Sequence, residues 1–436
     1  MQTGSCSISV IFLWLVTSAV LAKAVDNMEG NTAASKRPIR QSQSLCAGEQ
    51  EYVHKRKQVV LESLRRLGIN CAADSVPHIA LLASGGGQRA AVGLVGSLYQ
   101  MEKEDLLDTL LYLGGVSGST WSMSSIYSDP QWSTNMDTAV SRLSGPGVEL
   151  GEAFAWINER SKDEYFSLTD VWGVLTSAGI MKQMDLRHLS DEVSRNATNP
   201  YPIYSAIEKH CFSDGPIEGK WLEVSPHEAG FTELGLFIET SLLGSKFEGG
   251  ELLEEKPEMD MVTLQDSMVP LCLRSEERFH LVDAGLLINV AYPPFLGDKR
   301  DIDLIVAPEY SAGNMFETLT LARDYAAEVR RAFPDINNKT LEERDWPKDC
   351  YVFEGKQNEP SIIYLPLFNR RNCKDAEEVK AKMEEFSTFQ RPFSQEKIEF
   401  VLEVAKDNIK NNKETLLREI NKAVLRQHNK RKSMQH

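Results

Sequence analysis

A serine within a run of small residues is the first candidate for chemistry. Gly115-Val-Ser117-Gly-Ser119 follows a short apolar run and precedes a helical pattern. In G-x-S-x-G motifs, small neighbours allow a sharp turn between strand and helix that exposes the serine hydroxyl. Ser119 stands where the motif has its last glycine, so the pattern alone is equally compatible with a plain turn of small residues. Its position after a predicted strand favours a nucleophilic Ser117.

Three consecutive glycines lie one predicted strand earlier, in Ser84-Gly-Gly-Gly87-Gln-Arg89. Their unshielded N–H groups could face a developing oxyanion, which is worth roughly 10²- to 10³-fold in rate per donor. With Ala90, the same glycines also match a dinucleotide-binding fingerprint. That alternative needs an acidic residue at the end of the next strand, and this strand ends instead in the Ser117 motif.

Arg89 follows the glycines at the start of the next predicted helix. A planar guanidinium and a helix N-terminus both favour an anion, so Arg89 is a candidate phosphate ligand. A surface ion pair is the alternative for this residue.

The candidate base for Ser117 is Asp283, which ends a predicted strand and precedes Ala-Gly. Hydrolases with the order Ser…Asp…His have the histidine last. Only His428 and His436 follow Asp283, in a charged tail that would not fix the distance of about 3 Å that proton transfer needs. Three earlier histidines are weaker candidates: His210, His227 and His280. The economical mechanism is a Ser–Asp dyad.

Strand and helix patterns alternate around these motifs. Strand, glycine turn and helix occur twice in succession, which is typical of a parallel sheet with sites at the carboxyl ends of its strands. We expect strands near His78–Ala83, Thr109–Leu113, Phe279–Val282 and Ile302–Val306. We expect helices near Glu49–Leu67, Ala90–Met101, Phe316–Phe333, Gln395–Lys410 and Glu414–Leu425.

The composition narrows the function classes. The chain has 436 residues, with 42% hydrophobic and 25% charged, which is typical of globular proteins. A net charge of −15 argues against a general nucleic-acid binder. No central run approaches the roughly 20 apolar residues of a membrane-spanning helix. The seven cysteines include no C-x-x-C, which argues against a zinc ribbon, and they are too sparse for a disulfide scaffold.

The two termini suggest the boundaries of the domain. Ile8–Ala22 is apolar and is followed by small residues, so residues 1–24 are predicted to be a cleaved secretory signal, although Met1–Ser7 has no Lys or Arg. An uncleaved anchor or a misassigned start is the alternative. Sequons at Asn196 and Asn338 would be glycosylated only on that route. We expect a polar linker at 25–45, a catalytic domain at 46–425 and a frayed basic tail at 426–436.

Several motifs, in order, resemble the catalytic domain of the cytosolic (group IV) phospholipase A2 family. They are SGGGQRA (Ser84–Ala90), GVSGSTW (Gly115–Trp121), YPIYSAI (Tyr201–Ile207), WLEVSPHEAGF (Trp221–Phe231), GSKF (Gly244–Phe247) and VDAGL (Val282–Leu286). The resemblance covers roughly Cys46 to Leu425. Patatin-like acyl hydrolases share the glycine loop and the serine turn but not the Pro-Ile-Tyr-Ser or Ser-Pro-His-Glu stretches.

The resemblance implies a fold and a set of roles. The fold would be α/β, with a central mixed sheet flanked by helices and a small cap, as in patatin-like and phospholipase acyl hydrolases. Ser117 would be the nucleophile and Asp283 the base that activates it. The oxyanion hole would consist of Gly86 and Gly87, and the phosphate ligands would be Arg89 and Arg300.

The sequence therefore predicts a phospholipase A2 that cleaves fatty-acyl esters of glycerophospholipids at a membrane surface, with no metal or other cofactor. A lysophospholipase or a CoA-independent transacylase is the alternative, since the same dyad serves all three, and the intact motifs argue against an inactive lipid-binding relative. Roughly 45 residues precede the resemblance, too few for a C2 domain, so calcium dependence is not expected. The family implies the cytosol with peripheral membrane association, whereas residues 1–24 suggest the secretory route.

Overall fold

The computed structural model describes residues 39–162, 166, 168–248, 251–267, 281–356, 358–388 and 392–434. The predicted signal, Met1–Ala24, lies outside these residues, as does most of the predicted linker. None of the described helices is both long and apolar enough to cross a membrane.

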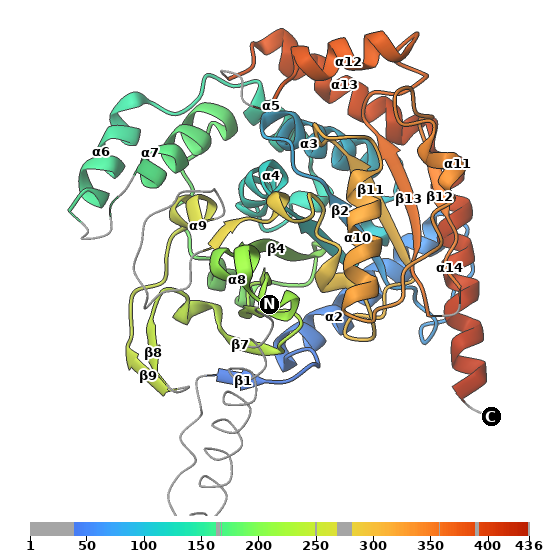
Figure 1. Cartoon of the computed structure of the whole chain (residues 1–436), viewed down its shortest axis with the longest axis horizontal. Helices are drawn as coiled ribbons and strands as arrows, with labels where there is room; N and C mark the ends of the chain where they lie inside the picture. Colours follow the sequence, from blue (N-terminus) through green and yellow to red (C-terminus); the bar gives the residue numbers. More distant parts are fainter. Residues whose placement is uncertain are drawn as a thin grey trace, which may run out of the picture. The chain divides into compact units, whose positions relative to one another are not determined.

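The core of the fold is a central mixed sheet, as predicted (Figure 1). Within the described residues this sheet has eleven strands. Five neighbouring strands, β4, β3, β2, β11 and β13, run parallel, and the strands beyond both ends of this group are antiparallel. In spatial order the strands are β1 (Ile39–Gln41), β7 (Leu236–Glu239), β6 (Glu228–Phe231), β5 (Trp221–Val224), β4 (Tyr201–Glu208), β3 (Tyr112–Gly115), β2 (Ile79–Ala83), β11 (Leu304–Glu309), β13 (Ser361–Pro366) and β12 (Tyr351–Phe353). The eleventh strand, β10 (Leu281–Asp283), pairs with β4 alone.

Strand β4 is long enough to carry two partners along one edge. The first half of β4 pairs in parallel with β3, so that Gly115 lies opposite Tyr204. The second half pairs antiparallel with β10, so that Asp283 lies opposite Ala206. Because β10 runs back toward β3, the carboxyl ends of the two strands meet beside the middle of β4.

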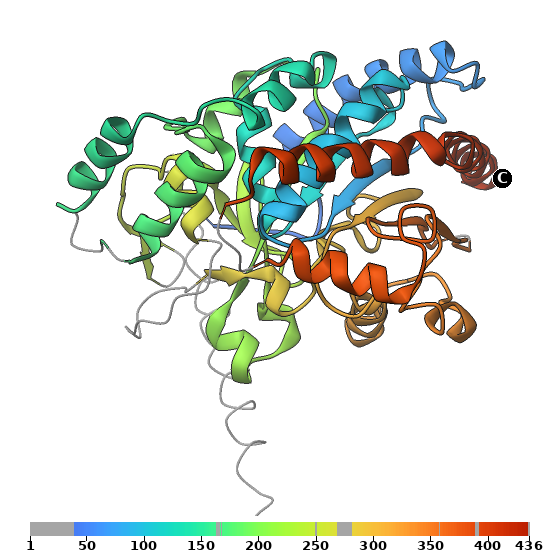
Figure 2. The ribbon, with the colours of Figure 1, turned by 90° about the horizontal axis from the view of Figure 1, so that it is seen from above.

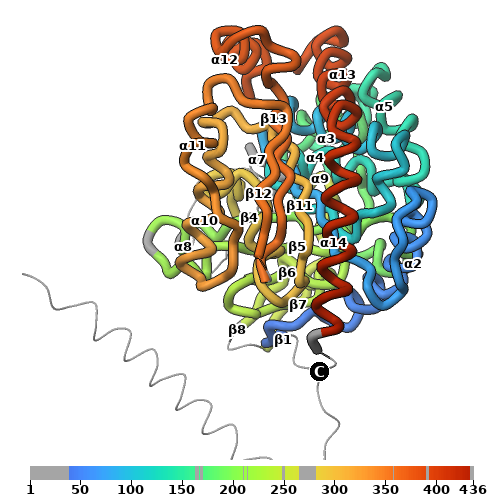
Figure 3. The backbone as a smooth tube through the Cα atoms, turned by 90° about the vertical axis from the view of Figure 1, so that its right-hand side faces the viewer, coloured from blue at the N-terminus to red at the C-terminus, as the bar shows by residue number. Residues whose placement is uncertain are grey.

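Helices cover both faces of the sheet. Figures 2 and 3 show α3 (Gln88–Lys103), α13 (Gln395–Asn411) and α14 (Lys413–Met434) on one face, and α10 (Glu317–Glu328) and α11 (Asn338–Leu341) on the other. Helix α3 lies between the sheet and α13, so most of its side chains are buried. A Cβ on Gly96 would lie only 2.7 Å from the Leu402 oxygen, so this glycine permits the close packing of α3 on α13.

Further helices lie before and beside this core. Helix α2 (Ala47–Arg66) leads into β2, and α4 (Gly118–Tyr127) follows β3 directly. The remaining longer elements are α5 (Asp137–Leu143), α8 (Lys209–Asp214), α12 (Ala376–Glu385) and a hairpin of β8 (Lys246–Glu248) and β9 (Glu251–Glu254).

The predicted small cap consists of α6 (Leu150–Arg160), α7 (Leu168–Val174), a π-helical turn (Leu175–Met181) and α9 (Met261–Ser267). Figure 1 shows α6 and α7 to one side of the sheet. The cap has its own apolar cluster, formed by Ala153, Val174 and Val262. The family fold predicted from the motifs is thus confirmed in its main layers and in its cap.

The structure corrects two predicted boundaries. Ile39–Gln41 was expected in a polar linker, but it forms β1, and Arg40 Nη2 donates to Glu228 Oε2 at 2.7 Å. The predicted frayed tail is helical as far as Met434, because α14 continues through it. Arg426 Nη1 donates to the Glu359 oxygen at 2.9 Å, and Lys430 Nζ lies 2.9 Å from Asp301 Oδ1. These tertiary contacts, rather than local sequence, order both segments.

Candidate active site

Ser117 occupies a strained turn between β3 and α4. Its φ of 50° and ψ of −131° lie in a region that non-glycine residues rarely adopt, and such strain is concentrated at functional sites. The Ser119 hydroxyl closes the turn by accepting from the Val116 N–H at 2.9 Å and donating to the Val116 oxygen at 2.7 Å. The residue that departs from the G-x-S-x-G pattern therefore stabilises the turn.

This turn between β3 and α4, Gly115–Ser119, is called the elbow below, and it leaves Ser117 accessible. All residues of α4 are buried, whereas Ser117, at the N-cap of this helix, is partly exposed. A Cβ on Gly115 would lie 2.5 Å from Met123 Sδ, and one on Gly118 would lie 2.1 Å from the Gly87 oxygen. Both glycines are thus needed for close packing around the turn, as the small-residue motif predicts.

Asp283 reaches the elbow from the end of β10. Its Oδ1 accepts from the Gly285 N–H at 2.8 Å, and the Ser117 side chain lies close enough to favour the ionised form of the carboxylate. Burial raises the pKa of Asp283 above its usual value, and the hydrogen bonds from Ser117 and Gly285 only partly oppose this effect. A carboxylate with a raised pKa is a better proton acceptor than an exposed one.

The glycine loop lies against the elbow. Gly86 and Gly87 have φ values of 143° and 59°, so both adopt backbone conformations that other residues rarely enter. Gly85 N–H donates to the Asn289 oxygen at 2.9 Å. Within the described residues, the N–H groups of Gly86 and Gly87 have no hydrogen-bond partner. They are therefore available to an oxyanion formed at Ser117.

Arg89 does not face an open phosphate site in this structure. Its side chain is fully buried, and its Nε donates to the Tyr310 oxygen at 2.6 Å. Its two terminal nitrogens donate to the Phe386 oxygen and to Thr388 Oγ1. Burial lowers the pKa of Arg89 to about 10, so it stays charged at neutral pH. The residue therefore does not form the surface ion pair given as its alternative. Its buried contacts link the helix after the glycine loop to Tyr310 and Phe386, which favours a role in bracing the loop, and phosphate binding stays a prediction.

The prediction for Arg300 as a phosphate ligand is contradicted by its surroundings. Its guanidinium is fully buried and binds Glu49 at 2.8 Å, Glu223 at 2.8 Å and the Pro294 oxygen at 2.7 Å. Burial opposes ionisation of Glu223, but Arg300 and Lys299 hold its pKa at about 2. Two carboxylates thus already occupy the anion-binding side of this arginine.

The position of Arg300 also separates it from the nucleophile. Its guanidinium lies 5.7 Å from the ring of Tyr112, the first residue of β3. Ser117 follows the other end of that strand, five residues on, or roughly 16 Å at the usual rise of a strand. Arg300 therefore lies at the amino ends of the parallel strands, opposite the end that carries Ser117.

The structure excludes one of the histidine alternatives. His227 Nδ1 lies 2.7 Å from the hydroxyl of Tyr201, at the start of β4 and away from Asp283. The side chain of His210 and the whole of His280 lie outside the described residues. The dyad therefore remains the mechanism that the described geometry supports.

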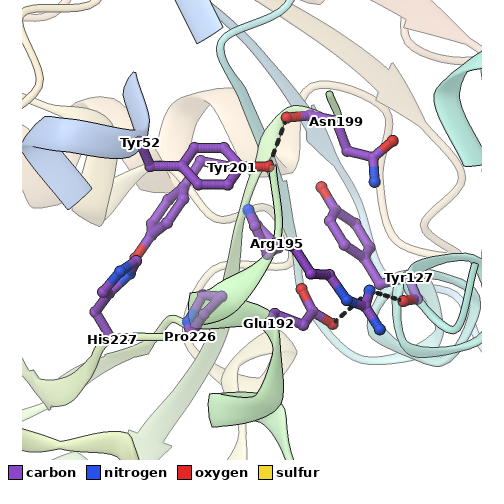
Figure 4. A pocket seen from close by; sticks show the side chains of 9 residues that line it. Tyr52, Tyr127, Glu192, Arg195, Asn199, Tyr201, Pro226 and His227 are labelled. Atoms are coloured by element: carbon purple, nitrogen blue, oxygen red, sulfur yellow. Dashed lines mark hydrogen bonds and ion pairs between the residues drawn. The ribbon is translucent and has the colours of Figure 1, made fainter. Parts of the chain in front are cut away.

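A small cavity lies beside Tyr201, at the amino end of β4 (Figure 4). Its volume of about 10 Å³ suits a single water molecule. Burial raises the pKa of Glu192 to about 7 despite Arg195 and Arg187 nearby. The lining is mostly aromatic and polar: Tyr52, Tyr127, Glu192, Arg195, Asn199, Tyr201, Pro202, Pro226 and His227. The cavity is too small for a lipid and is separate from the dyad.

Comparisons with known proteins agree with the fold and the motifs. A family model described as the lysophospholipase catalytic domain matches residues 151–266. Mouse cytosolic phospholipase A2 zeta is 28% identical over 506 residues, covering 83% of this chain and 59% of the mouse protein. Human cytosolic phospholipase A2 gamma is 25% identical, covering 85% of this chain and 94% of the human protein. The chain is thus similar to cytosolic phospholipase A2 enzymes over most of its length.

A solved relative shares the fold. Human GIVD cytosolic phospholipase A2, in complex with methyl gamma-linolenyl fluorophosphonate, superimposes with a TM-score of 0.76 at 23% identity. The match covers 91% of this chain and 67% of that chain. The family-model match begins after Ser117 and ends before Asp283. The roles of both residues therefore depend on the geometry described above.

Sequence reasoning missed three residues that complete the site. Asn289 contacts the glycine loop, and Tyr310 and Thr388 bind the Arg89 guanidinium. None stands in a motif that carries chemistry by itself. Thr388 is 299 residues from Arg89 in the sequence, and only the fold brings the two together.

The raised pKa of Asp283 predicts a stability effect with a defined sign. A buried carboxyl whose folded pKa exceeds its unfolded pKa stabilises the fold at low pH, and this contribution is lost as pH rises through the folded value. We therefore expect Asp283→Asn to raise the melting temperature at pH 7 to 8, and this gain to disappear below about pH 4, near the unfolded pKa. Thermal unfolding across pH 4 to 8 measures the difference.

The exposed Asp345 provides the control for this series. Asp345→Asn should change the melting temperature little at any of these pH values. An Asp283→Asn protein less stable than wild type at pH 7 would contradict the assignment of Asp283 as a desolvated carboxylate.

Proposed function

We propose that this chain is a serine acyl hydrolase that cleaves fatty-acyl esters of glycerophospholipids at a membrane surface, as a phospholipase A2. The observation that carries the proposal is the position of Ser117, which lies in a strained turn beside the Asp283 carboxylate. The unpaired N–H groups of Gly86 and Gly87 beside it support the assignment. The relationship to cytosolic phospholipase A2 enzymes supports the choice of substrate class.

Acylation begins with attack of Ser117 Oγ on the ester carbonyl carbon, while the Asp283 carboxylate takes the hydroxyl proton. The carbonyl oxygen becomes an oxyanion that accepts hydrogen bonds from Gly86 and Gly87. When the tetrahedral intermediate collapses, the ester C–O bond breaks and Asp283 returns its proton to the leaving alcohol. The products of this half-reaction are a lysophospholipid and an acyl-enzyme on Ser117.

Deacylation repeats these steps with a different nucleophile. Asp283 takes a proton from a water molecule, whose oxygen attacks the acyl carbon. Ser117 leaves and regains its proton from Asp283, and a free fatty acid is released. An alcohol or lysophospholipid in place of water would give a transacylase, and a lysophospholipid substrate would give a lysophospholipase. The matching family model is described as a lysophospholipase catalytic domain, which supports lysophospholipase activity as the second candidate.

The cap supplies a surface suited to a lipid interface. On α6, Leu150 and Phe154 are 74% and 66% exposed and lie four residues apart, on one face of the helix. Trp172 on α7 is also exposed, and Leu286, three residues after Asp283, is 52% exposed. Exposed apolar side chains that form a contiguous patch mark an interaction surface. Helix α6 also carries Glu152 and Glu159, so we propose contact with zwitterionic rather than anionic lipid.

We propose a cytosolic location, which the relatives' names support, and peripheral association with membranes, which follows from the proposed substrate. The mouse zeta enzyme is longer than this chain, which spans 59% of its length. The secretory alternative depends on Met1–Ala24 and stays a prediction.

Ser117→Ala and Asp283→Ala should each abolish release of fatty acid from phosphatidylcholine vesicles. The double variant should lose no more than either single one, because the two residues act as a unit. Resolving the products by mass distinguishes the three activities by the lysophospholipid, fatty acid or transferred acyl chain that accumulates. Ser144→Ala, at an exposed serine after α5, should retain wild-type activity. Full activity in Ser117→Ala would sink the proposal.

Two substrates separate the two roles of Arg89. If its guanidinium binds phosphate, Arg89→Ala should lower hydrolysis of phospholipids far more than that of a neutral, phosphate-free ester. If it braces the glycine loop, as its buried contacts favour, both rates should fall in parallel. Arg89→Lys should rescue only partly in either case, because an ammonium lacks the planar fork. We expect the parallel fall, and selective loss of phospholipid cleavage would refute bracing.

The cap surface can be tested apart from the chemistry. The double variant Leu150→Ser and Phe154→Ser should weaken binding to phosphatidylcholine vesicles, measured by flotation, and lower hydrolysis of vesicle lipid. Cleavage of a soluble monomeric ester should stay near the wild-type rate, since α6 contributes no residue to the dyad. Leu321→Ser, at a 40% exposed position on α10, is the matched control. Unchanged vesicle binding by the double variant would show that this face is not the lipid contact.

A further inference from the structure

Asn289 lies between the catalytic segments, yet the mechanism above gives it no role. Its backbone oxygen accepts from the Gly85 N–H at 2.9 Å, and the next residue, Val290, forms an antiparallel bridge with Ser84. The chain that leaves Asp283 is thereby tied to the first residues of the glycine loop.

The Asn289 carboxamide fills the space between two motif glycines. A Cβ on Gly85 would lie 2.2 Å from Asn289 Oδ1 and 2.8 Å from the Ser117 Cβ. A Cβ on Gly285 would lie 2.6 Å from the same Oδ1 and 3.0 Å from Asp283 Oδ1. Side-chain carbons do not approach other atoms this closely. Both glycines therefore make room for one carboxamide, which separates the glycine loop from the turn that holds Asp283.

The carboxamide combines a fixed shape with hydrogen-bonding capacity. An asparagine side chain offers an acceptor oxygen and two N–H donors. In the described part of the chain, the Asn289 side chain makes no hydrogen bond, and the residue is partly exposed. Because the side chain contacts segments on both sides of the dyad, its volume affects the distance between Ser117 and Asp283. A misplacement of 1 Å in an active site can cost about 100-fold in rate.

We propose that Asn289 is a positioning residue of the acyl hydrolase. Its carboxamide sets the spacing between the glycine loop and the Asp283 turn, and thereby aligns the Ser117 hydroxyl with its base and with the oxyanion donors. This inference rests on the proposed function, because it concerns the same site.

Two variants of Asn289 test the proposal. Asn289→Ala removes the spacer. We expect the rate of Ser117 phosphonylation by a fluorophosphonate probe, with release of fluoride, and kcat for lipid hydrolysis to fall about 10- to 100-fold with little change in KM. Asn289→Asp keeps the shape but places a second carboxylate beside the Asp283 turn. Repulsion between like charges should then shift the acid limb of the pH–rate profile to higher pH.

The pH readout is interpretable because few groups act on Asp283. Burial raises the pKa of Asp283, and the neighbouring Ser117 and Gly285 lower it. Within the described chain, no charged side chain contributes to this shift. Asn337→Asp is the matched control, since Asn337 is exposed and caps α11 through a hydrogen bond from Lys339 N–H that an aspartate can also accept. This control should leave the rate and the profile unchanged.

The possible outcomes separate the inference from the function beneath it. A folded Asn289→Ala protein that reacts with the probe and hydrolyses lipid at the wild-type rate would overturn the positioning role, as would Asn289→Asp with an unshifted profile. If Asn289→Ala does not fold, as judged by thermal unfolding, the isosteric Asn289→Asp decides the question. A wild-type chain that neither hydrolyses lipid nor reacts with the probe at Ser117 would overturn the proposed function itself.

Discussion

The site depends on the two partners that share one edge of β4. Because β3 and β10 pair with successive halves of that edge, their carboxyl ends meet, and Ser117 and Asp283 are brought together from positions 166 residues apart. A register shift of one residue in either pairing would turn the catalytic side chain toward the other face of the sheet. The buried, fully paired β4 prevents such a shift, since its opposite edge is held by β5.

Close backbone packing is the second requirement of the site. The elbow and the glycine loop approach so closely that a side chain at Gly118 would overlap the Gly87 oxygen. This contact places free N–H groups beside the nucleophile, but it leaves Ser117 and Gly87 in backbone conformations that need external support. The Ser119 hydroxyl supports the elbow, and the buried Arg89 links the loop to Tyr310 and to the segment at Phe386.

The two ends of the parallel strands have different physical roles. At the carboxyl end, a desolvated Asp283 and unpaired N–H groups are unfavourable for stability and favourable for chemistry. At the amino end, Arg300 is neutralised by Glu49 and Glu223, and the small cavity beside Tyr201 is lined by paired polar groups. The ion-pair cluster joins α2, β5 and the segment before β11.

The sequence by itself determined the layered fold and the nearness of Ser117 and Asp283, because glycine turns after apolar runs restrict the backbone locally and strand ends of a parallel sheet converge. Strands β2 and β3 and helices α3 and α13 begin within two or three residues of their predicted positions, and the central mixed sheet follows from them. The roles of the arginines were decided only by the tertiary structure. A guanidinium binds phosphate or carboxylate with the same geometry, and whether Glu49 and Glu223 occupy Arg300 depends on contacts spanning 251 and 77 residues. Three further features have the same cause: the helical C-terminus, the strand at Ile39–Gln41 and the position of the Asn289 carboxamide. Each is fixed by partners distant in the sequence, which no local pattern specifies.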